Sequence, residues 1–366
     1  MTTTEAAVVE SGGKPFTLTE ITLDAPRPDE VLVTMVAAGL CHTDLGVASG
    51  GLPFPLPGVL GHEGAGIVEE VGTAVTSVKA GDKVVLSFTS CGACRNCRGG
   101  HPAYCDTWLP SNLIGGVRAD GSSTISRGDE NLGGRFFGQS SFSRVALVDE
   151  RSIVKVADDA PLELLAPLGC GIQTGAGAIW NVLAPRPGDS VVVLGAGAVG
   201  LSAVMAAALT PAGIIVAVDK VASRLDLARE LGATHTVNVS DTDDLVGAIT
   251  DLTGGADGVV ETTGSTAVLR QGVDALAARG TAVIVGAPPF GTEVALDVNG
   301  MIAGKRVVGL TLGDSETQTL IPALVELVSS GRMPIGKLIR EYPFADIQTA
   351  VGDVTSGATI KPVLRF

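Results

Sequence analysis

Four of the six cysteines lie within residues 91–105, in the stretch CGACRNCRGGHPAYC. The thiols follow the spacing C-x2-C-x2-C-x7-C, at Cys91, Cys94, Cys97 and Cys105. Four thiolates from one short loop can surround a zinc ion as a tetrahedron. A bacterial iron–sulfur loop differs, because three residues precede its last cysteine and a proline follows it. The spacing therefore favours zinc, and four protein ligands leave no position for a substrate, which indicates a structural site.

Three further residues have the types expected of a second metal site. Cys41 lies in AAGLCHTDLG, His62 in LGHEGAGIVEEVG and Cys170 in APLGCGIQTGAGA. A lone cysteine more often packs in a core as a small apolar residue than binds a metal. Two cysteines and one histidine with an open fourth position are, however, a ligand set of catalytic zinc. The combination therefore favours a metal-binding role over simple packing.

A glycine pattern of the dinucleotide-binding type lies in VVVLGAGAVGLSAVMAAAL. Gly195, Gly197 and Gly200 form G-x-G-x-x-G between a β-branched run and an Ala-rich segment. The first glycine permits the turn, the second lets the backbone approach a pyrophosphate, and the third lets helix and strand pack closely. The N-terminus of the following helix offers N–H groups to the anion. A tight turn without nucleotide is the alternative, but the strand, turn and helix together favour nucleotide binding.

Asp219 ends the next apolar run, GIIVAVDK, about 20 residues after the glycines, where the dinucleotide fingerprint has an acidic residue. Its carboxylate can accept hydrogen bonds from the ribose hydroxyls and would repel a 2′-phosphate. The sequence therefore predicts NAD rather than NADP as cofactor. Lys220 and Arg224 lie close by and moderate that preference.

Composition limits the classes of partner. The chain has 366 residues, 39 of them acidic and 25 basic, with a formal net charge of -14. This charge disfavours nucleic acid, and the length favours two domains. The opening stretch MTTTEAAVVESGGKPF lacks the features of a secretion signal. We therefore expect a cytoplasmic protein whose cysteines bind metal rather than form disulfides, and whose partners are small molecules or copies of itself.

Residues 191–218 contain no charged residue and are long enough to span a bilayer. The run nevertheless changes from β-branched to glycine-containing to Ala-rich, which is typical of a buried strand, turn and helix in a βαβ unit. Further strands are expected at ATHTVNV, ADGVVETTG and GTAVIVGAPP. The predicted fold class is thus α/β, with no membrane partner and a doubly wound parallel sheet at residues 171–310.

The N-terminal part has a different pattern. Short runs such as EVLVTMVAAG, GAGIVEEVG and GDKVVLSF are separated by Gly and Pro. This pattern predicts an antiparallel, barrel-like β domain. The last part of the chain, from LIPALVELVSSGRM to ATIKPVLRF, is predicted to form a helix and strands.

These motifs together resemble the medium-chain zinc-dependent alcohol dehydrogenase family over essentially the whole chain. The segment Gly61–Val75 fits the family's zinc signature, G-H-E-x2-G-x5-G-x2-V, and the four-cysteine loop has the family's spacing. The resemblance implies a GroES-like β-barrel catalytic domain at 1–170, to which a C-terminal segment at 311–366 returns. A Rossmann-type NAD-binding domain would occupy 171–310.

The resemblance also implies roles for individual residues. Cys41, His62 and Cys170 would bind a catalytic zinc, and the four-cysteine loop a structural zinc, giving two ions per chain. Asp44 would orient His62. Glu63 would lie behind the metal, where a purely structural role is the alternative. The remaining residues implied are Thr43 as acceptor of the alcohol's proton, Thr174 and Val199 at the nicotinamide, and His42 and Lys361 at the pyrophosphate.

The implied reaction is reversible transfer of hydride from an alcohol to NAD, for which zinc acts as Lewis acid. Two positions depart from many relatives. Gly46 stands where they carry a histidine that ends the proton relay, so water is a candidate route for the proton. His42 stands where they carry arginine, which weakens the charge offered to the pyrophosphate.

The substrate class is indicated only by the resemblance. RFFGQ followed by SSFSRVALV, and GCGIQTGAGAIWNVL, look like the aryl- and benzyl-alcohol branch, and Phe88 precedes the cysteine loop where relatives place an aromatic wall. Primary aryl or allylic alcohols are therefore expected, with assembly into a dimer or tetramer. A polyol or secondary-alcohol dehydrogenase and a non-catalytic NAD-binding zinc protein are the alternatives, both disfavoured by the complete set of ligands including Cys170.

Overall fold

The computed structural model describes the whole chain, residues 1–366, which divides into two compact units. Met1–Cys170 and Glu316–Phe366 form one of them, called here the discontinuous unit. Gly171–Ser315 forms the other, called the parallel-sheet unit. The second junction therefore lies after Ser315, somewhat later than the residue 310 expected from the sequence.

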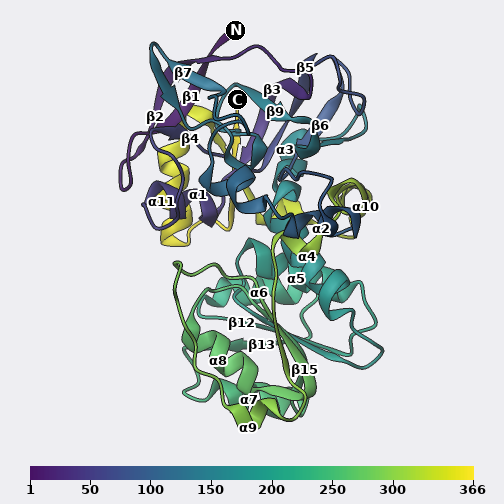
Figure 1. Ribbon diagram of the computed structural model, residues 1–366. Helices are drawn as coiled ribbons and strands as arrows, with labels where there is room; N and C mark the ends of the chain where they lie inside the picture. Colours follow the sequence, from purple (N-terminus) through teal and green to yellow (C-terminus); the bar gives the residue numbers. More distant parts are fainter. The chain divides into compact units, whose positions relative to one another are not determined.

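The discontinuous unit is built from two mainly antiparallel sheets (Figure 1), in the second of which β17 and β18 pair in parallel. The first has the order β4 (Gly58–Val59), β1 (Thr2–Val9), β2 (Phe16–Leu23), β7 (Ile125–Arg127) and β8 (Glu130–Leu132). The second has the order β10 (Ile153–Lys155), β6 (Lys83–Leu86), β5 (Gly64–Val71), β3 (Glu30–Gly39), β18 (Lys361–Arg365) and β17 (Ile339–Pro343), with β9 (Val145–Asp149) also on β3. Its helices are α1 (His42–Ala48), α2 (Arg95–Arg98), α3 (Leu162–Leu165), α10 (Thr317–Ser329) and α11 (Ile347–Ser356).

The runs expected as strands form β3, β5 and β6, which are neighbours in the second sheet. Their inward side chains make a core that includes Val33, Met35, Val68 and Leu86. The C-terminal strand β18 pairs antiparallel with β3, with Val363 opposite Gly39 and Leu364 opposite Ala38. The last residues of the chain thus return to the N-terminal part, as expected.

The parallel-sheet unit has six parallel strands in the order β13 (His235–Asn238), β12 (Ile214–Asp219), β11 (Ser190–Leu194), β14 (Ala256–Glu261), β15 (Leu276–Ile284) and β16 (Arg306–Gly309). The helices of this unit are α4 (Gly171–Gly177), α5 (Ala198–Ala208), α6 (Ala222–Glu230), α7 (Leu245–Thr253), α8 (Thr266–Asp274) and α9 (Val298–Met301). This order, in which the chain reverses direction at β11, is the doubly wound arrangement. The predicted fold class is confirmed.

The apolar stretch 191–218 forms β11, α5 and β12 inside this unit. Both strands are buried because the sheet is covered on both faces. No helix of the chain combines the length and the hydropathy that crossing a membrane would require.

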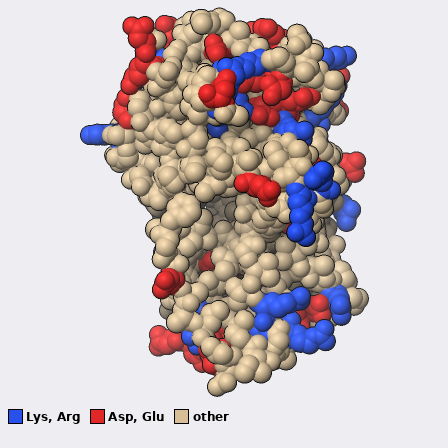
Figure 2. Space-filling view, viewed as in Figure 1, with Lys and Arg blue, Asp and Glu red and all other residues tan.

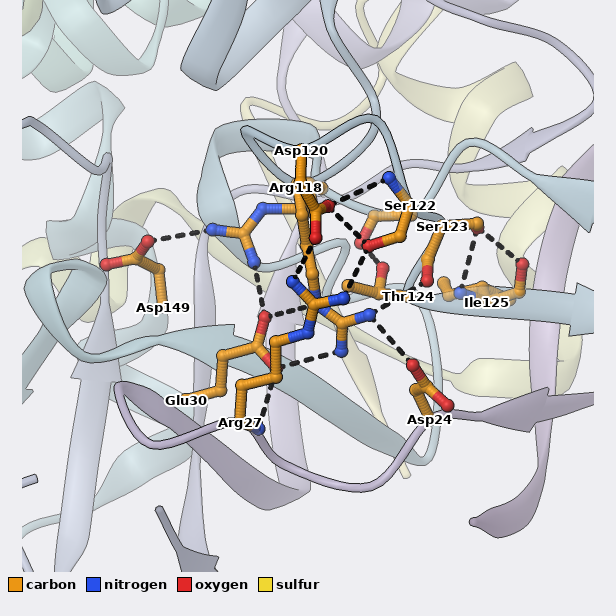
Figure 3. Close-up of polar contacts among 12 residues, drawn as sticks. Asp24, Arg27, Glu30, Arg118, Asp120, Ser122, Ser123, Thr124, Ile125 and Asp149 are labelled. Atoms are coloured by element: carbon orange, nitrogen blue, oxygen red, sulfur yellow. Dashed lines mark hydrogen bonds and ion pairs between the residues drawn. The ribbon is translucent and has the colours of Figure 1, made fainter. Parts of the chain in front are cut away.

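A buried ion-pair network anchors the start of β3 (Figure 3). Glu30 is 3% exposed, and its carboxylate accepts hydrogen bonds from Arg118 Nε at 2.7 Å and Arg118 Nη2 at 2.9 Å. Arg135 Nη1 donates to the same carboxylate at 2.9 Å and also pairs, through Nη2, with Asp149 at 2.7 Å. Arg118 pairs in turn with Asp24 at 2.8 Å. The network therefore ties β3 and β9 to the loops on either side of β7 and β8.

The pKa of Glu30 lies below its ordinary value of 4.5. Burial would raise this pKa, but hydrogen bonds from Arg118 and from the backbone N–H of Arg27, with the charges of Arg118 and Arg135, outweigh the burial. Glu30 therefore stabilises the folded chain when it is ionised. This contribution is complete above the ordinary pKa and is lost as the pH falls through the lower pKa of the folded state.

We expect Glu30→Gln to lower the free energy of unfolding by about 3 kcal/mol at neutral pH, because it leaves Arg118 buried without its full counter-charge. Urea unfolding measures the change. The matched control is Glu10→Gln, whose partner Arg127 lies at 2.6 Å in a pair that is substantially exposed. This control should lose less than about 1 kcal/mol.

The difference in stability between wild type and Glu30→Gln should shrink as the pH falls below about 4.5. The reason is that protonated Glu30 in the wild type loses the same ionic contribution that the variant lacks. Equal losses in the Glu30 and Glu10 variants, or a difference that stays constant down to about pH 3, would contradict this assignment.

Candidate metal and cofactor sites

The ligand atoms of Cys41, His62, Glu63 and Cys170 all lie within 4.8 Å of one another in the discontinuous unit. Cys41 directly precedes α1, and His62 and Glu63 directly precede β5. Cys170 follows a short helical turn that ends at Gly169. Residues that the sequence separates by more than a hundred positions are thus brought to one point by the ends of strands and helices.

His62 has the environment of a metal ligand. Its Nδ1 lies 3.0 Å from Asp44 Oδ1, and both side chains are fully buried. Its Nε2 is buried and has no hydrogen-bond partner. A buried imidazole with one nitrogen held by a carboxylate and the other without a partner fits a metal ion at the second nitrogen. The donor set of two thiols and one imidazole fits zinc in particular.

Asp44 holds this arrangement together. Its Oδ2 accepts a hydrogen bond from the backbone N–H of Cys41 at 2.9 Å, and its Oδ1 accepts one from the N–H of Gly61 at 3.1 Å. One carboxylate therefore contacts the segments that carry two of the expected ligands. The sequence resemblance implied an orienting role for Asp44, and that role stays a prediction with which these contacts are compatible.

The electrostatics of the group favour a cation. Burial lowers the pKa of His62, but the charge and hydrogen bond of Asp44 outweigh it and raise this pKa to about 10. The pKa of the Cys41 thiol lies well below its ordinary value, chiefly because Cys170 donates a hydrogen bond to the thiolate. The thiolate and the Asp44 carboxylate therefore create a site that attracts a proton or a metal ion at Nε2.

Glu63 and Lys361 form a buried ion pair beside this group. Lys361 Nζ lies 2.9 Å from Glu63 Oε1 and 2.8 Å from Oε2, and it also donates to Leu40 O at 3.3 Å. Glu63 is fully buried and Lys361 is 3% exposed. The resemblance implied a pyrophosphate contact for Lys361, which stays a prediction, and in this structure its ammonium group pairs with Glu63. The pairing supplies the counter-charge that a buried carboxylate requires.

Sequence reasoning did not assign Gln139 and the aromatic rings around His62. Gln139 Nε2 donates to His62 O at 3.0 Å and to Ser87 O at 2.7 Å. Phe137 stacks on the imidazole of His62 with ring centroids 4.5 Å apart, and Phe136 meets it edge to face at 5.3 Å. Trp108 contacts Phe137 at 5.7 Å. The aromatic residues and the glutamine of the stretch RFFGQ could be noticed in the sequence. Nothing in the sequence, however, indicated that they contact His62.

The four cysteines of the loop form the second group, with Cys91, Cys94, Cys97 and Cys105 sulfurs all within 4.8 Å of one another. All six cysteines of the chain are free thiols. Backbone N–H groups point to these sulfurs, among them those of Cys94 to Cys91 at 3.3 Å and of Cys91 to Cys105 at 3.3 Å. Such contacts stabilise thiolates, so the group fits a metal ion bound by four sulfurs.

The glycine turn has the geometry of the dinucleotide fingerprint. Gly195 has φ +100°, which disfavours any side chain. A Cβ on Gly200 would come 1.8 Å from Gly195 O, so helix α5 packs directly on the turn. A Cβ on Gly197 would meet nothing within 4 Å, so the backbone there is open to a ligand. Asp219 Oδ2 accepts a hydrogen bond from the N–H of Ala196 at 2.7 Å, which fixes its carboxylate beside the turn.

The other site residues predicted from the sequence are distributed over both units. His42 is exposed at the first turn of α1, and Thr43 follows it with Oγ1 at 3.9 Å from Cys41 Sγ. Thr174 is buried in α4, Val199 is half-buried in α5, and Arg224 is half-buried in α6. A Cβ at Gly46 would lie 2.9 Å from Leu52 Cδ1, so Leu52 takes up part of the space that a side chain there would need.

Comparison with known proteins identifies the class. Residues 27–158 match the family model "Alcohol dehydrogenase GroES-like domain", and residues 198–329 match "Zinc-binding dehydrogenase". A geraniol dehydrogenase from Castellaniella defragrans is 42% identical over 364 residues, covering 99% of this chain and 97% of the relative.

Two solved structures are similar over the whole chain. An alcohol dehydrogenase zinc-binding domain protein from Burkholderia ambifaria has a TM-score of 0.97 and 51% identity, covering 100% of this chain and 99% of its own. Benzyl alcohol dehydrogenase from Acinetobacter calcoaceticus has a TM-score of 0.96 and 46% identity, covering 100% of both chains. The chain belongs to the zinc-dependent alcohol dehydrogenase family of the medium-chain type, whose members use zinc and a nicotinamide cofactor.

Proposed function

We propose that this protein catalyses the reversible, NAD-linked oxidation of primary aryl or allylic alcohols to aldehydes, with a catalytic and a structural zinc ion in each chain. The observation that carries the proposal is the unpartnered Nε2 of His62, buried among the thiols of Cys41 and Cys170. Zinc held by these three residues would act as a Lewis acid toward the alcohol oxygen, and NAD would accept the hydride.

The chain's own residues would orient the substrate and move its proton. Thr43 Oγ1, next to Cys41, is the group that we assign to receive the alcohol proton. Gly46 has no side chain to pass it on, which leaves water as the onward route. His42, exposed on α1, would contribute to holding the pyrophosphate, while Thr174 and Val199 would contact the nicotinamide.

The ring cluster at His62 supports the aryl or allylic class of substrate. Phe137 and Phe136 present apolar faces and edges beside the ligand group, and Phe54 extends the cluster by an edge-to-face contact with Phe136 at 5.1 Å. Flat or unsaturated groups gain about 0.5–1.5 kcal/mol from such ring contacts beyond simple burial. The names of two relatives, a geraniol and a benzyl alcohol dehydrogenase, point to the same class.

We further propose a cytoplasmic protein that assembles with copies of itself as a dimer or tetramer. The free state of all six cysteines supports a reducing compartment. Assembly is supported by exposed apolar side chains in the parallel-sheet unit, where Val298 is 74% and Ile302 76% exposed. The edge strand β16 of the sheet lies just beyond them in the sequence.

Metal analysis of the purified protein should find two zinc ions per chain. Cys170→Ser should abolish turnover and leave one zinc bound. Cys97→Ser should impair folding, because structural zinc supplies on the order of 10 kcal/mol of apparent binding energy in zinc-finger peptides. Asp44→Asn should weaken binding of the zinc at Cys41, His62 and Cys170 about 10- to 100-fold in a chelator titration. The zinc of the four-cysteine loop is the internal control. Iron, or a single zinc in the wild type, would overturn the two-site assignment.

NAD should support turnover at least roughly tenfold better than NADP, since a 2′-phosphate would be placed against the Asp219 carboxylate. Asp219→Gly should narrow that ratio, measured as kcat/KM for each cofactor. Asp226→Asn is the matched control, because Asp226 is exposed on α6 and pairs with Arg229. Equal use of both cofactors by the wild type would show that Lys220 and Arg224 recruit the phosphate instead.

A panel of alcohols tests the substrate class. Benzyl, cinnamyl and geraniol-type alcohols should have higher kcat/KM than ethanol, and sorbitol should be nearly inactive because each unpaired hydroxyl costs about 1–3 kcal/mol. Phe137→Leu should reduce the preference for benzyl alcohol over ethanol by up to about tenfold. Phe344→Leu is the control, since its ring pairs with Phe366 elsewhere in the unit. Ethanol or sorbitol as the best substrate would refute the aryl or allylic class.

A further inference from the structure

A cavity of about 380 Å³ lies at the amino ends of the parallel strands. It is lined by the first residues of β11 and β16, Ser190 and Arg306, and by Asp257 near the start of β14. The glycine turn and Asp219 lie at the carboxyl ends of β11 and β12, where doubly wound sheets bind dinucleotides. The cavity is therefore at the opposite end of the strands from the proposed NAD site. Its volume is within the range of small-molecule sites.

Three exposed arginines line this cavity: Arg186, Arg279 and Arg306. None of the three guanidinium groups takes part in an ion pair, although the chain has 39 acidic and 25 basic residues. Some other arginines of the chain are held by carboxylates, as Arg270 is by Asp274 at 2.7 Å in the same unit. Figure 2 shows Lys and Arg side chains in several groups on the visible face, most of them with acidic side chains close by. Guanidinium groups that line one cavity and form no ion pair are suited to a bound anion.

The backbone at Arg279 has an unusual conformation. Arg279 has φ +67°, a left-handed conformation that is costly for a residue with a side chain. It lies in an irregularity of β15, because Leu276 pairs with Ala256 and Thr281 pairs with Gly258. Between these two pairs β15 has several more residues than β14, and the additional residues form a bulge. The N–H of Arg279 donates to Ala303 O at 3.0 Å, which holds the bulge in place.

Two carboxylates line another part of the cavity, and each has one oxygen already engaged. Asp257 Oδ2 accepts hydrogen bonds from Ser190 N at 2.8 Å and Ser190 Oγ at 3.0 Å. Asp189 Oδ2 accepts one from Arg186 N at 2.8 Å. The hydrogen bonds therefore leave the second oxygen of each carboxylate available as an acceptor. A ligand that satisfies the whole lining must carry an anionic group for the arginines and hydroxyl donors for Asp257 and Asp189.

We propose that this cavity binds a sugar phosphate, with the phosphate held by Arg186, Arg279 and Arg306 and the sugar hydroxyls donating to Asp257 and Asp189. Phosphate oxygens match the planar donor fork of arginine. Inorganic phosphate alone makes no use of the carboxylates and is repelled by them, whereas a neutral sugar makes no use of the arginines. The site is independent of the zinc centre and of the alcohol reaction.

Isothermal titration calorimetry with ribose 5-phosphate tests the site in the zinc-loaded protein. NADH is kept at saturation so that the dinucleotide site is filled. Inorganic phosphate and ribose are titrated separately as the two halves of the ligand. We expect ribose 5-phosphate to bind at least about tenfold more tightly than either half, because only the whole molecule makes both sets of charge-assisted hydrogen bonds.

Arg279→Gly is the informative variant, because it removes a guanidinium group and relieves the left-handed backbone at once. It should bind ribose 5-phosphate at least about tenfold more weakly while its Tm rises or stays unchanged. Arg306→Gln should weaken binding similarly. The matched control, Arg332→Gln, removes an exposed arginine of the discontinuous unit and should leave binding unchanged.

Three results would overturn the proposal. Absence of ribose 5-phosphate binding under NADH saturation would show that the cavity takes no such ligand. Binding no tighter than that of inorganic phosphate would show a general anion site without a role for Asp257 and Asp189. Binding that survives Arg279→Gly and Arg306→Gln would place the ligand elsewhere.

Discussion

Charged groups that are completely buried have to be paired, and this constraint shapes the discontinuous unit. Asp44, His62 and Glu63 are fully buried, and Lys361 nearly so. An isolated ion in such a place would cost several kcal/mol, so each must meet a partner of opposite charge with good geometry. Asp44 meets His62, and Glu63 meets Lys361. The paths of the neighbouring strands follow from the need to bring these partners together.

The second sheet satisfies that need with its central strands. Strand β5 begins directly after His62 and Glu63, β3 ends just before Cys41, and β18 begins at Lys361. Because β3 pairs with both β5 and β18, the ends of these strands meet at one place. A Cβ at Gly39 would come 2.0 Å from a Glu63 carboxylate oxygen, so even the last residue of β3 is selected by this buried group. The ionic network at Glu30 secures the opposite end of β3.

Sequence reasoning reached the parts of the structure that depend on local patterns. The four-cysteine loop, the glycine turn and the strands β3, β5 and β6 are contiguous in the chain, so spacing and periodicity were enough to locate them. Cys41, His62 and Cys170 lie apart, and they could be grouped because few other residues offered a compatible ligand set.

Other features depend on contacts that no local pattern encodes. Glu63, the ion-pair partner of Lys361, lies 298 residues away in the sequence. Gln139 contacts His62 O and Ser87 O through a side-chain amide that has many possible uses, and the stacking of Phe137 on His62 depends on the same loop. Arg186, Arg279 and Arg306 come from three separate segments of the parallel-sheet unit and lie where the dinucleotide fingerprint gives no information. These contacts become visible only when the strand order is known.

The division of the discontinuous unit between the two ends of the chain also sets an order of events during synthesis. Residues 171–315 are contiguous, so the parallel-sheet unit can fold while the C-terminus is still on the ribosome. The discontinuous unit lacks β18 until residues 361–365 have been added, and without β18 the carboxylate of Glu63 has no ammonium group beside it. The segments carrying Cys41 and His62 can therefore settle only once β18 is present, so a polypeptide that ends before β18 retains a folded parallel-sheet unit but no finished thiol–imidazole centre.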